Sequence, residues 1–338
     1  MKDVQRQTRS YLMALFRDHG YNPRSDLGQN FLIDVNLIEL VVRSADLGPD
    51  DVVLEVGAGT GGMTAFLAAQ AARVVSIEID PRMYQLAASA VEHCTNVVLL
   101  NRDILKNKNR LCPEIMQVIE EAVKSVPGGR LKLVANLPYS VATPVISNVI
   151  ASELPWTRIV ATIQWELAEK MAASPGSPVF GALSAWIQAQ SSIRIIRRMG
   201  PNVFWPRPKV DSAIISIWRD EDLAARIADR SFLHDFLRRL FHHRRKLVRS
   251  VVAGMYRMQL DKSAVDAILA EQQLRPDLRA EQIDIETLIR LANRVRQAVL
   301  AAGDGSGGAS GVADDDPGVD GADVSADPVD SPAPAPEI

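Results

Sequence analysis

Val52-Val53-Leu54-Glu55-Val56-Gly57-Ala58-Gly59-Thr60-Gly61-Gly62 is the stretch of sequence that decides the fold. Its first five residues are mostly apolar and predict a buried strand, and the glycines that follow predict a turn into a helix. Glycine lets a ligand approach the backbone closely, and open α/β sheets bind ligands at the carboxyl ends of their strands. The stretch therefore favours a ligand site, although a tight turn without a ligand is the alternative for the glycines alone.

Strands and helices alternate along the chain after this stretch, which predicts a parallel sheet covered by helices on both faces. Two further strand-like runs on either side of a proline-rich loop predict an antiparallel pair at one edge of the sheet. From residue 231 to about residue 300 only helical periodicity remains, and it predicts a small helical domain. The predicted strands are residues 74–79, 97–100, 131–135 and 159–163, the antiparallel pair is 193–197 with 213–218, and the helices are 64–71, 83–91, 113–124 and 144–152.

The composition fits an ordinary two-domain globular protein, because the 338 residues are 47% hydrophobic. We expect a cytoplasmic protein with no membrane span, since no apolar run reaches about 18 residues and residues 1–16 do not form a signal peptide. Cys94 and Cys112 form no C-x-x-C pair, and no His/Cys cluster is present, so we expect no metal site. Nothing in the sequence indicates an obligate dimer, and a monomer is predicted.

Charge is distributed unevenly along the chain. The net charge is −3, but residues 303–338 carry nine acidic residues and no Lys or Arg, so residues 1–302 carry +6. A basic body favours a polyanionic partner. The tail is rich in Gly, Ala, Asp and Pro, and we expect it to be disordered because it cannot bury enough apolar surface.

Acidic residues follow the predicted strands next to the glycine turn. Glu78 ends one strand and can accept hydrogen bonds from both hydroxyls of a ribose. Asp103 follows the next strand and can accept from the exocyclic amine of an adenine. Glu55 precedes the glycines and is expected to face an ammonium group of the ligand. The spacing of Gly59 and Gly61 is shorter than in the dinucleotide fingerprint and suits a ligand without a pyrophosphate.

Asn136-Leu137-Pro138-Tyr139 follows the predicted strand at residues 131–135. The Asn136 side-chain oxygen and the Leu137 carbonyl can accept the two N–H protons of an adenine amine, and Pro138 makes that carbonyl rigid. Tyr139 offers an aromatic face on which a flipped base can stack. As a bare string the tetrapeptide could be only a proline turn. At a strand end beside a cofactor site it favours methyl transfer to an amine from a sulfonium donor.

With these residues in view, the chain resembles the small-subunit (16S) ribosomal RNA adenine dimethyltransferases, the kasugamycin-resistance methyltransferase family. The resemblance runs from about Leu27 to about Leu300, and two segments are quite specific to the family: Gly28-Gln29-Asn30-Phe31-Leu32 and Pro208-Lys209-Val210-Asp211-Ser212-Ala213. The chain departs from the family pattern in lacking lysines at residues 21–26, in a longer segment at 106–129 and in its acidic tail.

The resemblance implies a Rossmann-like S-adenosylmethionine-dependent methyltransferase fold, with a seven-stranded, mostly parallel sheet, an antiparallel edge strand and a small all-α C-terminal domain. The implied organisation is a polar N-terminal extension at 1–26, a catalytic domain at 27–219, an RNA-binding helical domain at 220–302 and the tail at 303–338. The implied reaction is N6,N6-dimethylation of two adjacent adenosines in a hairpin loop near the 3′ end of 16S rRNA, within the assembling small subunit.

The resemblance also assigns roles to matching residues. Seven residues would contact S-adenosylmethionine, among them the first two glycines of the turn: Asn30, Leu32, Gly57, Gly59, Glu78, Asp103 and Asn136. Asn136 and Tyr139 would hold the target adenine, with Phe204 stacking on its other face. For RNA, the proline-rich loop offers Arg207 and Lys209. A cationic stripe is predicted on one helix, formed by Arg238, His242, Arg245 and Arg249 with Lys246 beside it, although a solvated helix face is the alternative.

Two other functions are kept as alternatives. One is an adenine-N6 methyltransferase with a different substrate, such as 23S rRNA or DNA, and the Lys209-Val210-Asp211 segment counts against it. The other is a non-catalytic assembly factor with the same fold. The presence of Asn136, Tyr139, Glu78 and Asp103 counts against that alternative.

Overall fold

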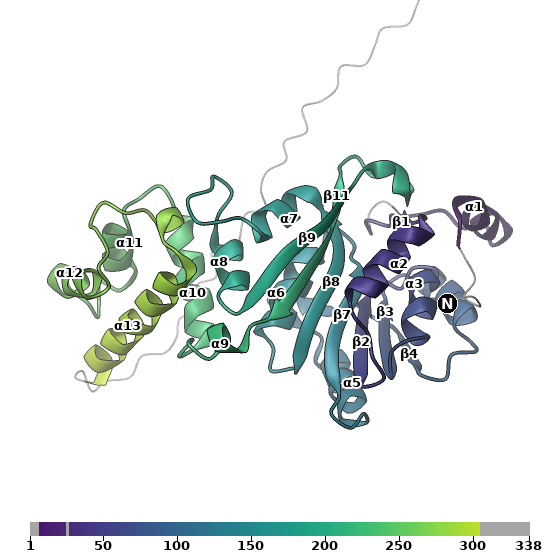
Figure 1. The fold of residues 1–338 in the computed structure, drawn as a ribbon, viewed down its shortest axis with the longest axis horizontal. Helices are drawn as coiled ribbons and strands as arrows, with labels where there is room; N and C mark the ends of the chain where they lie inside the picture. Colours follow the sequence, from purple (N-terminus) through teal and green to yellow (C-terminus); the bar gives the residue numbers. More distant parts are fainter. Residues whose placement is uncertain (1–6, 25–26, 305–338) are drawn as a thin grey trace, which may run out of the picture.

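A seven-stranded sheet forms the centre of the molecule in the computed structural model, which describes residues 7–24 and 27–304 (Figure 1). The strand order is β4-β3-β2-β7-β8-β11-β9. The first five strands in this order run parallel, and β11 is antiparallel to both of its neighbours, β8 and β9. The strands are β2 (Asp51–Val56), β3 (Arg73–Glu78), β4 (Val97–Asn101), β7 (Arg130–Asn136), β8 (Trp156–Gln164), β9 (Ser191–Met199) and β11 (Ser212–Arg219).

The predicted fold class is therefore confirmed. The antiparallel pair expected at one edge is β9 with β11, and the strand that runs against the others is β11, one place in from the edge. From β2 the chain builds outward to β3 and β4 on one side and then to β7 and β8 on the other. The carboxyl ends of β2 and β7 thus flank the point where the strand order reverses, which is where such sheets bind ligands.

Helices cover both faces of the sheet, as the alternating pattern predicts. Side chains of one face, such as Val53 and Val74, pack against α2 (Val35–Ser44) and α3 (Gly62–Ala68). Alternate side chains, such as Leu54, pack on the other face. The helices on that face include α5 (Pro113–Lys124), α6 (Ala142–Ala151), α7 (Trp165–Met171) and α8 (Ala182–Gln188), while α4 (Pro81–Ala90) follows β3.

Two short two-stranded ribbons lie outside the seven-stranded sheet. The ribbon of β1 (Phe31–Leu32) and β10 (Phe204–Trp205) pairs the end of the first family-specific segment with residues just before the second, with Phe31 opposite Trp205. The longer segment at 106–129 contains part of a hairpin, β5 (Leu105–Asn107) with β6 (Arg110–Leu111), followed by α5.

The N-terminal helix α1 (Arg9–Asp18) lies at the end of the molecule opposite the C-terminal helices (Figure 1). It buries Leu12 and Phe16, and Phe16 packs against Met83 and Leu86 of α4. The N-terminal segment is thus attached to α4 by apolar contacts. The tail predicted to be disordered lies, from residue 305 onward, outside the described residues.

The C-terminal part of the described chain is helical, as predicted. Its helices are α9 (Glu221–Ala224), α10 (Arg230–His242), α11 (Val248–Met255), α12 (Lys262–Glu271) and α13 (Ile285–Asp304). Phe180 packs edge-on against Phe241 of α10, which connects this part to the core under the sheet. Within residues 7–24 and 27–304, no helix combines the length and apolar character needed to cross a bilayer.

The prediction of one cationic stripe on a single helix is wrong. α10 ends at His242 and α11 begins at Val248, so Arg245 and Lys246 lie in the turn between them and Arg249 lies on the second helix. The apolar face of α10 includes Leu240 and Phe241, and one more turn would bring Arg244 onto that buried face. The chain turns instead, and exposed Arg244 pairs with Glu281.

Candidate active site

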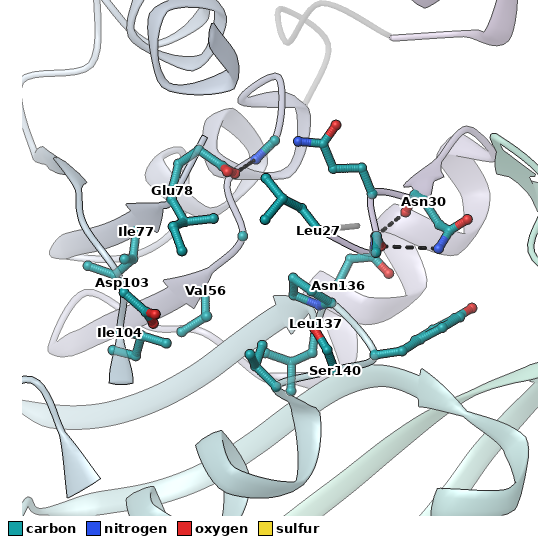
Figure 2. Close-up of a pocket in the computed structure, with 18 of the residues that line it drawn as sticks. Leu27, Asn30, Val56, Ile77, Glu78, Asp103, Ile104, Asn136, Leu137 and Ser140 are labelled. Atoms are coloured by element: carbon teal, nitrogen blue, oxygen red, sulfur yellow. Dashed lines mark hydrogen bonds between the residues drawn. The ribbon is translucent and has the colours of Figure 1, made fainter. Parts of the chain in front are cut away.

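A cleft opens at the carboxyl ends of β2, β3 and β7, where the sequence motifs converge. Figure 2 shows Glu78 and Asp103 on one side of this cleft and Asn30 on the other, with Asn136 and Leu137 between them. The residues that line the cleft and that were predicted from sequence are Asn30, Gly57, Gly59, Glu78, Asp103, Asn136, Leu137, Pro138 and Tyr139. The structure thus brings the glycine turn and the Asn-Leu-Pro-Tyr segment into one site.

The glycine turn lies directly against the Asn-Leu-Pro-Tyr segment. Gly57 has a φ of +84°, and a Cβ atom built on it would lie 3.1 Å from Cδ of Pro138. Gly59 has a φ of +56°, and its Cβ would lie 3.0 Å from the Phe31 ring. Positive φ and these close approaches both require glycine. The absence of side chains at these two positions lets the turn pack directly against Pro138 and Phe31.

Glu78 organises the glycine turn as well as the ligand side of the cleft. One carboxylate oxygen accepts the Gly59 N–H at 2.7 Å, and the other accepts the Asp80 N–H at 2.9 Å. The side chain is 5% exposed, and this burial raises the pKa of the carboxyl above its ordinary value. Each carboxylate oxygen has a further lone pair, so the group can accept from a diol that enters the cleft.

Asp103 lies at the mouth of the cleft, where one of its oxygens accepts the Leu105 N–H at 2.8 Å. Beside it, Ile79 and Ile104 form apolar walls, and Ile79 is 46% exposed although it is a large apolar residue. An apolar slot edged by a carboxylate suits a flat heterocycle that carries an amine. Sequence reasoning gives these two isoleucines no role, although they stand next to the two strand-end acids, and that position is the signal that could have found them.

Asn136 ends β7 with its side chain held in one orientation. Its Nδ2 donates to the Asn30 carbonyl at 2.9 Å, so its Oδ1 is left as an acceptor toward the cleft. The Leu137 N–H donates to the Thr162 carbonyl, and within the described parts of the chain nothing donates to the Leu137 carbonyl. Two oxygens from consecutive residues are therefore available to accept the two N–H groups of one amine.

Tyr139 lines the same cleft and is fixed by a residue from β11. Its hydroxyl lies 2.6 Å from Oγ of Ser212, which is fully buried. Burial raises the pKa of Tyr139, so its hydroxyl stays protonated at neutral pH. Ser212 belongs to the Pro-Lys-Val-Asp-Ser-Ala segment, and we infer that it positions the aromatic ring that is predicted to stack on the target base.

Replacing Ser212 with alanine should lower kcat/KM for the nucleic-acid substrate about tenfold, because a half-buried phenol loses its partner at a cost of about 1–3 kcal/mol. Cofactor affinity should not change. Tyr139→Phe is the matched variant, since it removes the same hydrogen bond and keeps the ring. In a double-mutant cycle the two changes together should cost no more than the larger of them. Fully additive losses would show that the two hydroxyls act independently.

The structure places Glu55 outside the main cleft, and its contact with a ligand stays a prediction. One of its carboxylate oxygens accepts from Thr64 Oγ1 and from Ser76 Oγ, both at 2.6 Å, beneath the glycine turn. Glu55 is 1% exposed and lines a small neighbouring cavity rather than the main cleft. Burial raises the pKa of Glu55 to about 7 despite the two hydroxyl donors.

Glu55 should therefore make the protein less stable as the pH rises through neutrality. Its pKa is higher in the folded chain than in the unfolded chain, so the folded state binds the extra proton, and the stabilisation present at low pH is lost as the pH passes about 7. Between about pH 5 and about pH 8 this loss amounts to roughly 2 kcal/mol. Urea unfolding at both pH values should show that loss in the wild type but not in Glu55→Gln. Equal pH dependence in both proteins would contradict the buried-acid account.

Two predicted site residues lie outside the main cleft. Leu32 and Phe204 face each other in the β1–β10 ribbon and are 7% and 3% exposed. Neither lines the main cleft, although Leu32 lines the small cavity next to Asn136, and Phe204 lines a separate groove that also includes Arg207. The contact of Phe204 with a target adenine stays a prediction.

The basic residues predicted to bind RNA occupy several places. Arg207 and Lys209 are exposed in the loop before β11. Arg238 pairs with Asp235, and Arg249 forms two hydrogen bonds to Asp266. Arg245 and Lys246 are exposed in the turn between α10 and α11. Their role in RNA binding stays a prediction. Among the described residues, no group of three or more His, Cys, Asp or Glu side chains is suited to a metal ion.

Comparisons with known proteins agree with this geometry. The family profile described as ribosomal RNA adenine dimethylase matches residues 20–296 of the chain. The chain is 34% identical over 267 residues to "Ribosomal RNA small subunit methyltransferase A" of Lachnoclostridium phytofermentans, covering 79% of this chain and 89% of that protein. It is 32% identical over 294 residues to the protein of the same name from Bacillus mycoides, covering 87% and 97%.

Solved structures show the same fold at lower sequence identity. A dimethyladenosine transferase from Plasmodium falciparum aligns with a TM-score of 0.66 and 21% identity, covering 78% of this chain and 97% of that one. The 23S rRNA methyltransferase ErmE aligns with a TM-score of 0.55 and 22% identity, covering 79% and 100%. The match to the family profile over most of the chain, together with the two relatives at 34% and 32% identity, establishes that the chain belongs to the ribosomal RNA adenine dimethylase family.

Proposed function

We propose that this protein transfers methyl groups from S-adenosylmethionine to the N6 atoms of two adjacent adenosines near the 3′ end of small-subunit rRNA, giving N6,N6-dimethyladenosine. The observation that carries the proposal is the pair of acceptors formed by Asn136 Oδ1 and the Leu137 carbonyl, beside the glycine turn. The family is one of rRNA adenine dimethylases, and its relatives named above are small-subunit methyltransferases.

The residues of the cleft fit S-adenosylmethionine. Glu78 suits the ribose hydroxyls, and Asp103 with Ile79 and Ile104 suits the adenine ring and its amine. The backbone of Gly57 and Gly59, which lines the cleft, suits the part of the ligand that passes the turn toward Asn30. When bound, this group supplies a methyl carbon already activated by an adjacent sulfonium, so no strong base is required of the protein.

The chain contributes positioning. Asn136 and Leu137 accept the two N–H groups of the target amine and direct its nitrogen toward the cofactor side of the cleft. The bond from Asn136 Nδ2 to the Asn30 carbonyl fixes which end of the amide faces the amine. Tyr139, held by Ser212, gives a flipped adenine a surface for stacking worth roughly 1–3 kcal/mol. The proton lost on methylation leaves to solvent, because the alkylated amine is acidic.

We further propose that the enzyme is a monomer, that it acts in the cytoplasm on assembling small subunits, and that the exposed cations of the helical part bind rRNA. In the turn between α10 and α11, Arg245 and Lys246 are exposed and have no ion-pair partner among the described residues. Binding through such cations should weaken as the salt concentration rises.

A reconstitution assay tests the proposal. Purified protein with labelled S-adenosylmethionine is offered immature small subunits or naked 23S rRNA fragments, and the nucleosides are identified by mass spectrometry. The proposal expects N6,N6-dimethyladenosine at two adjacent positions of the small-subunit RNA only. Transfer restricted to 23S fragments would support a different substrate. Failure to bind S-adenosylmethionine in calorimetry would support a non-catalytic assembly factor.

A further inference from the structure

A groove outside the cofactor cleft combines two cations that are far apart in the sequence. It measures about 440 Å³ and is lined by Arg9, Ile33, Asn202, Phe204, Trp205, Pro206 and Arg207. Arg9 begins α1, whereas Arg207 follows β10 in the proline-rich loop. The groove therefore exists only because α1 packs onto the catalytic part of the chain.

The charged residues that line this groove are all positive. Neither guanidinium has an ion-pair or hydrogen-bond partner among the residues that the structure describes, and both arginines are exposed. None of the lining residues is acidic, and the exposed amide of Asn202 adds a polar group. Two unpaired guanidiniums in one concave surface match a phosphate, because arginine forms paired hydrogen bonds to phosphate oxygens.

The groove also adjoins the active site. Its Trp205 is paired with Phe31 in the β1–β10 ribbon, and the Trp205 ring lies 5.2 Å from that of Phe16 on α1. Phe31 in turn lines the cofactor cleft and lies against Gly59. The groove and the cleft are thus separated only by the two-stranded β1–β10 ribbon. Neighbouring nucleotides of one RNA strand could therefore occupy both.

We propose that this groove binds the phosphate backbone of the substrate RNA next to the target adenosines, with Arg9 and Arg207 as its ligands. The proposal rests on the proposed function for the identity of the RNA. It also gives the N-terminal segment a role in substrate binding: the chain lacks lysines at residues 21–26, and the cation comes from α1 instead.

Binding of an RNA oligonucleotide that contains the 3′-terminal small-subunit hairpin and its flanking single strand tests the proposal. The double variant Arg9→Gln/Arg207→Gln should bind this RNA about 100-fold more weakly, about tenfold for each guanidinium. The slope of log affinity against log salt should fall by about 0.7 for each phosphate that the variant no longer neutralises. S-adenosylmethionine affinity should equal that of the wild type, which also reports that the variant is folded.

The matched control is Arg17→Gln/Arg73→Gln, which removes the same charge at two exposed positions outside both the groove and the helical part. It should change RNA affinity less than about threefold, as expected when only long-range attraction is weakened. Wild-type affinity and salt slope in the groove variant, or an equal loss of affinity in the control, would overturn the proposal. If the wild type binds RNA through the groove but methylates no small-subunit RNA, only the proposed function fails.

Discussion

Replacing Asn136 with alanine should reduce kcat for methyl transfer about 100- to 1000-fold, the size of effect seen when one preorganised polar contact to a reacting group is removed. The target amine loses one of its two acceptors and is no longer held toward the cofactor side of the cleft. The substitution should have little effect on the stability of the fold, because the only other hydrogen bond of the side chain, among the described residues, is the one to the Asn30 carbonyl. Loss of that bond should cost about 1 kcal/mol of unfolding free energy.

Asn136→Asp is the matched variant. It keeps an acceptor oxygen of the same shape but cannot donate to the Asn30 carbonyl, so its orientation is less fixed. Its kcat should lie between those of the wild type and Asn136→Ala in single-turnover assays with saturating RNA and cofactor. A rate for Asn136→Ala within about threefold of the wild type would contradict the role of this side chain in holding the amine.

Replacing Glu78 with glutamine should weaken S-adenosylmethionine binding about 100-fold while leaving RNA affinity within about twofold of the wild type. The carboxylate has acceptors only, and it already accepts the N–H groups of Gly59 and Asp80. Glutamine must turn an NH2 group toward one of those donors, and this disturbs the turn. The substitution also removes the negative charge, which strengthens hydrogen bonds from ribose hydroxyls to about 1.5–3 kcal/mol each.

The pH dependence of cofactor binding distinguishes the effect of the Glu78 charge from the effect of its side-chain shape. Burial raises the pKa of Glu78, so the carboxylate gains its proton at a higher pH than an exposed glutamate does. Wild-type cofactor affinity, measured by calorimetry, should therefore fall as the pH drops from neutrality toward that raised pKa. Glu78→Gln should show a flatter profile. A larger loss of RNA affinity than of cofactor affinity would show that the ribose lies elsewhere.

The sequence predicts the sheet and the convergence of its motifs for a simple physical reason. The central strands β2 and β7 are buried on both faces and appear as mostly apolar runs, which Glu55 and Lys132 interrupt. Because parallel strands share one carboxyl edge, polar residues at the ends of several runs must meet there. Glu78, Asp103 and Asn136 can be identified in this way, without knowledge of the side-chain contacts.

The remaining features depend on tertiary contacts that no local pattern encodes. Glu55 lies in one of those strands, and the hydroxyls that turn it away from the cleft belong to Thr64 and Ser76 on two other elements. The β1–β10 ribbon that buries Phe204 has only two residues in each strand, too few for any periodicity. The basic residues from Arg238 to Arg249 are spaced as on one helix, but the chain turns at His243. It turns there because the apolar face of α10 ends before the run of basic residues does.

The most direct measurement is a structure of the protein with a non-reactive S-adenosylmethionine analogue and an RNA hairpin bearing the two adjacent adenosines. Our account predicts the adenine N6 atom at about 2.9 Å from both Asn136 Oδ1 and the Leu137 carbonyl oxygen, with the base stacked on Tyr139. An adenine whose amino group points away from those two oxygens, or a cofactor analogue bound outside the glycine turn, would contradict it.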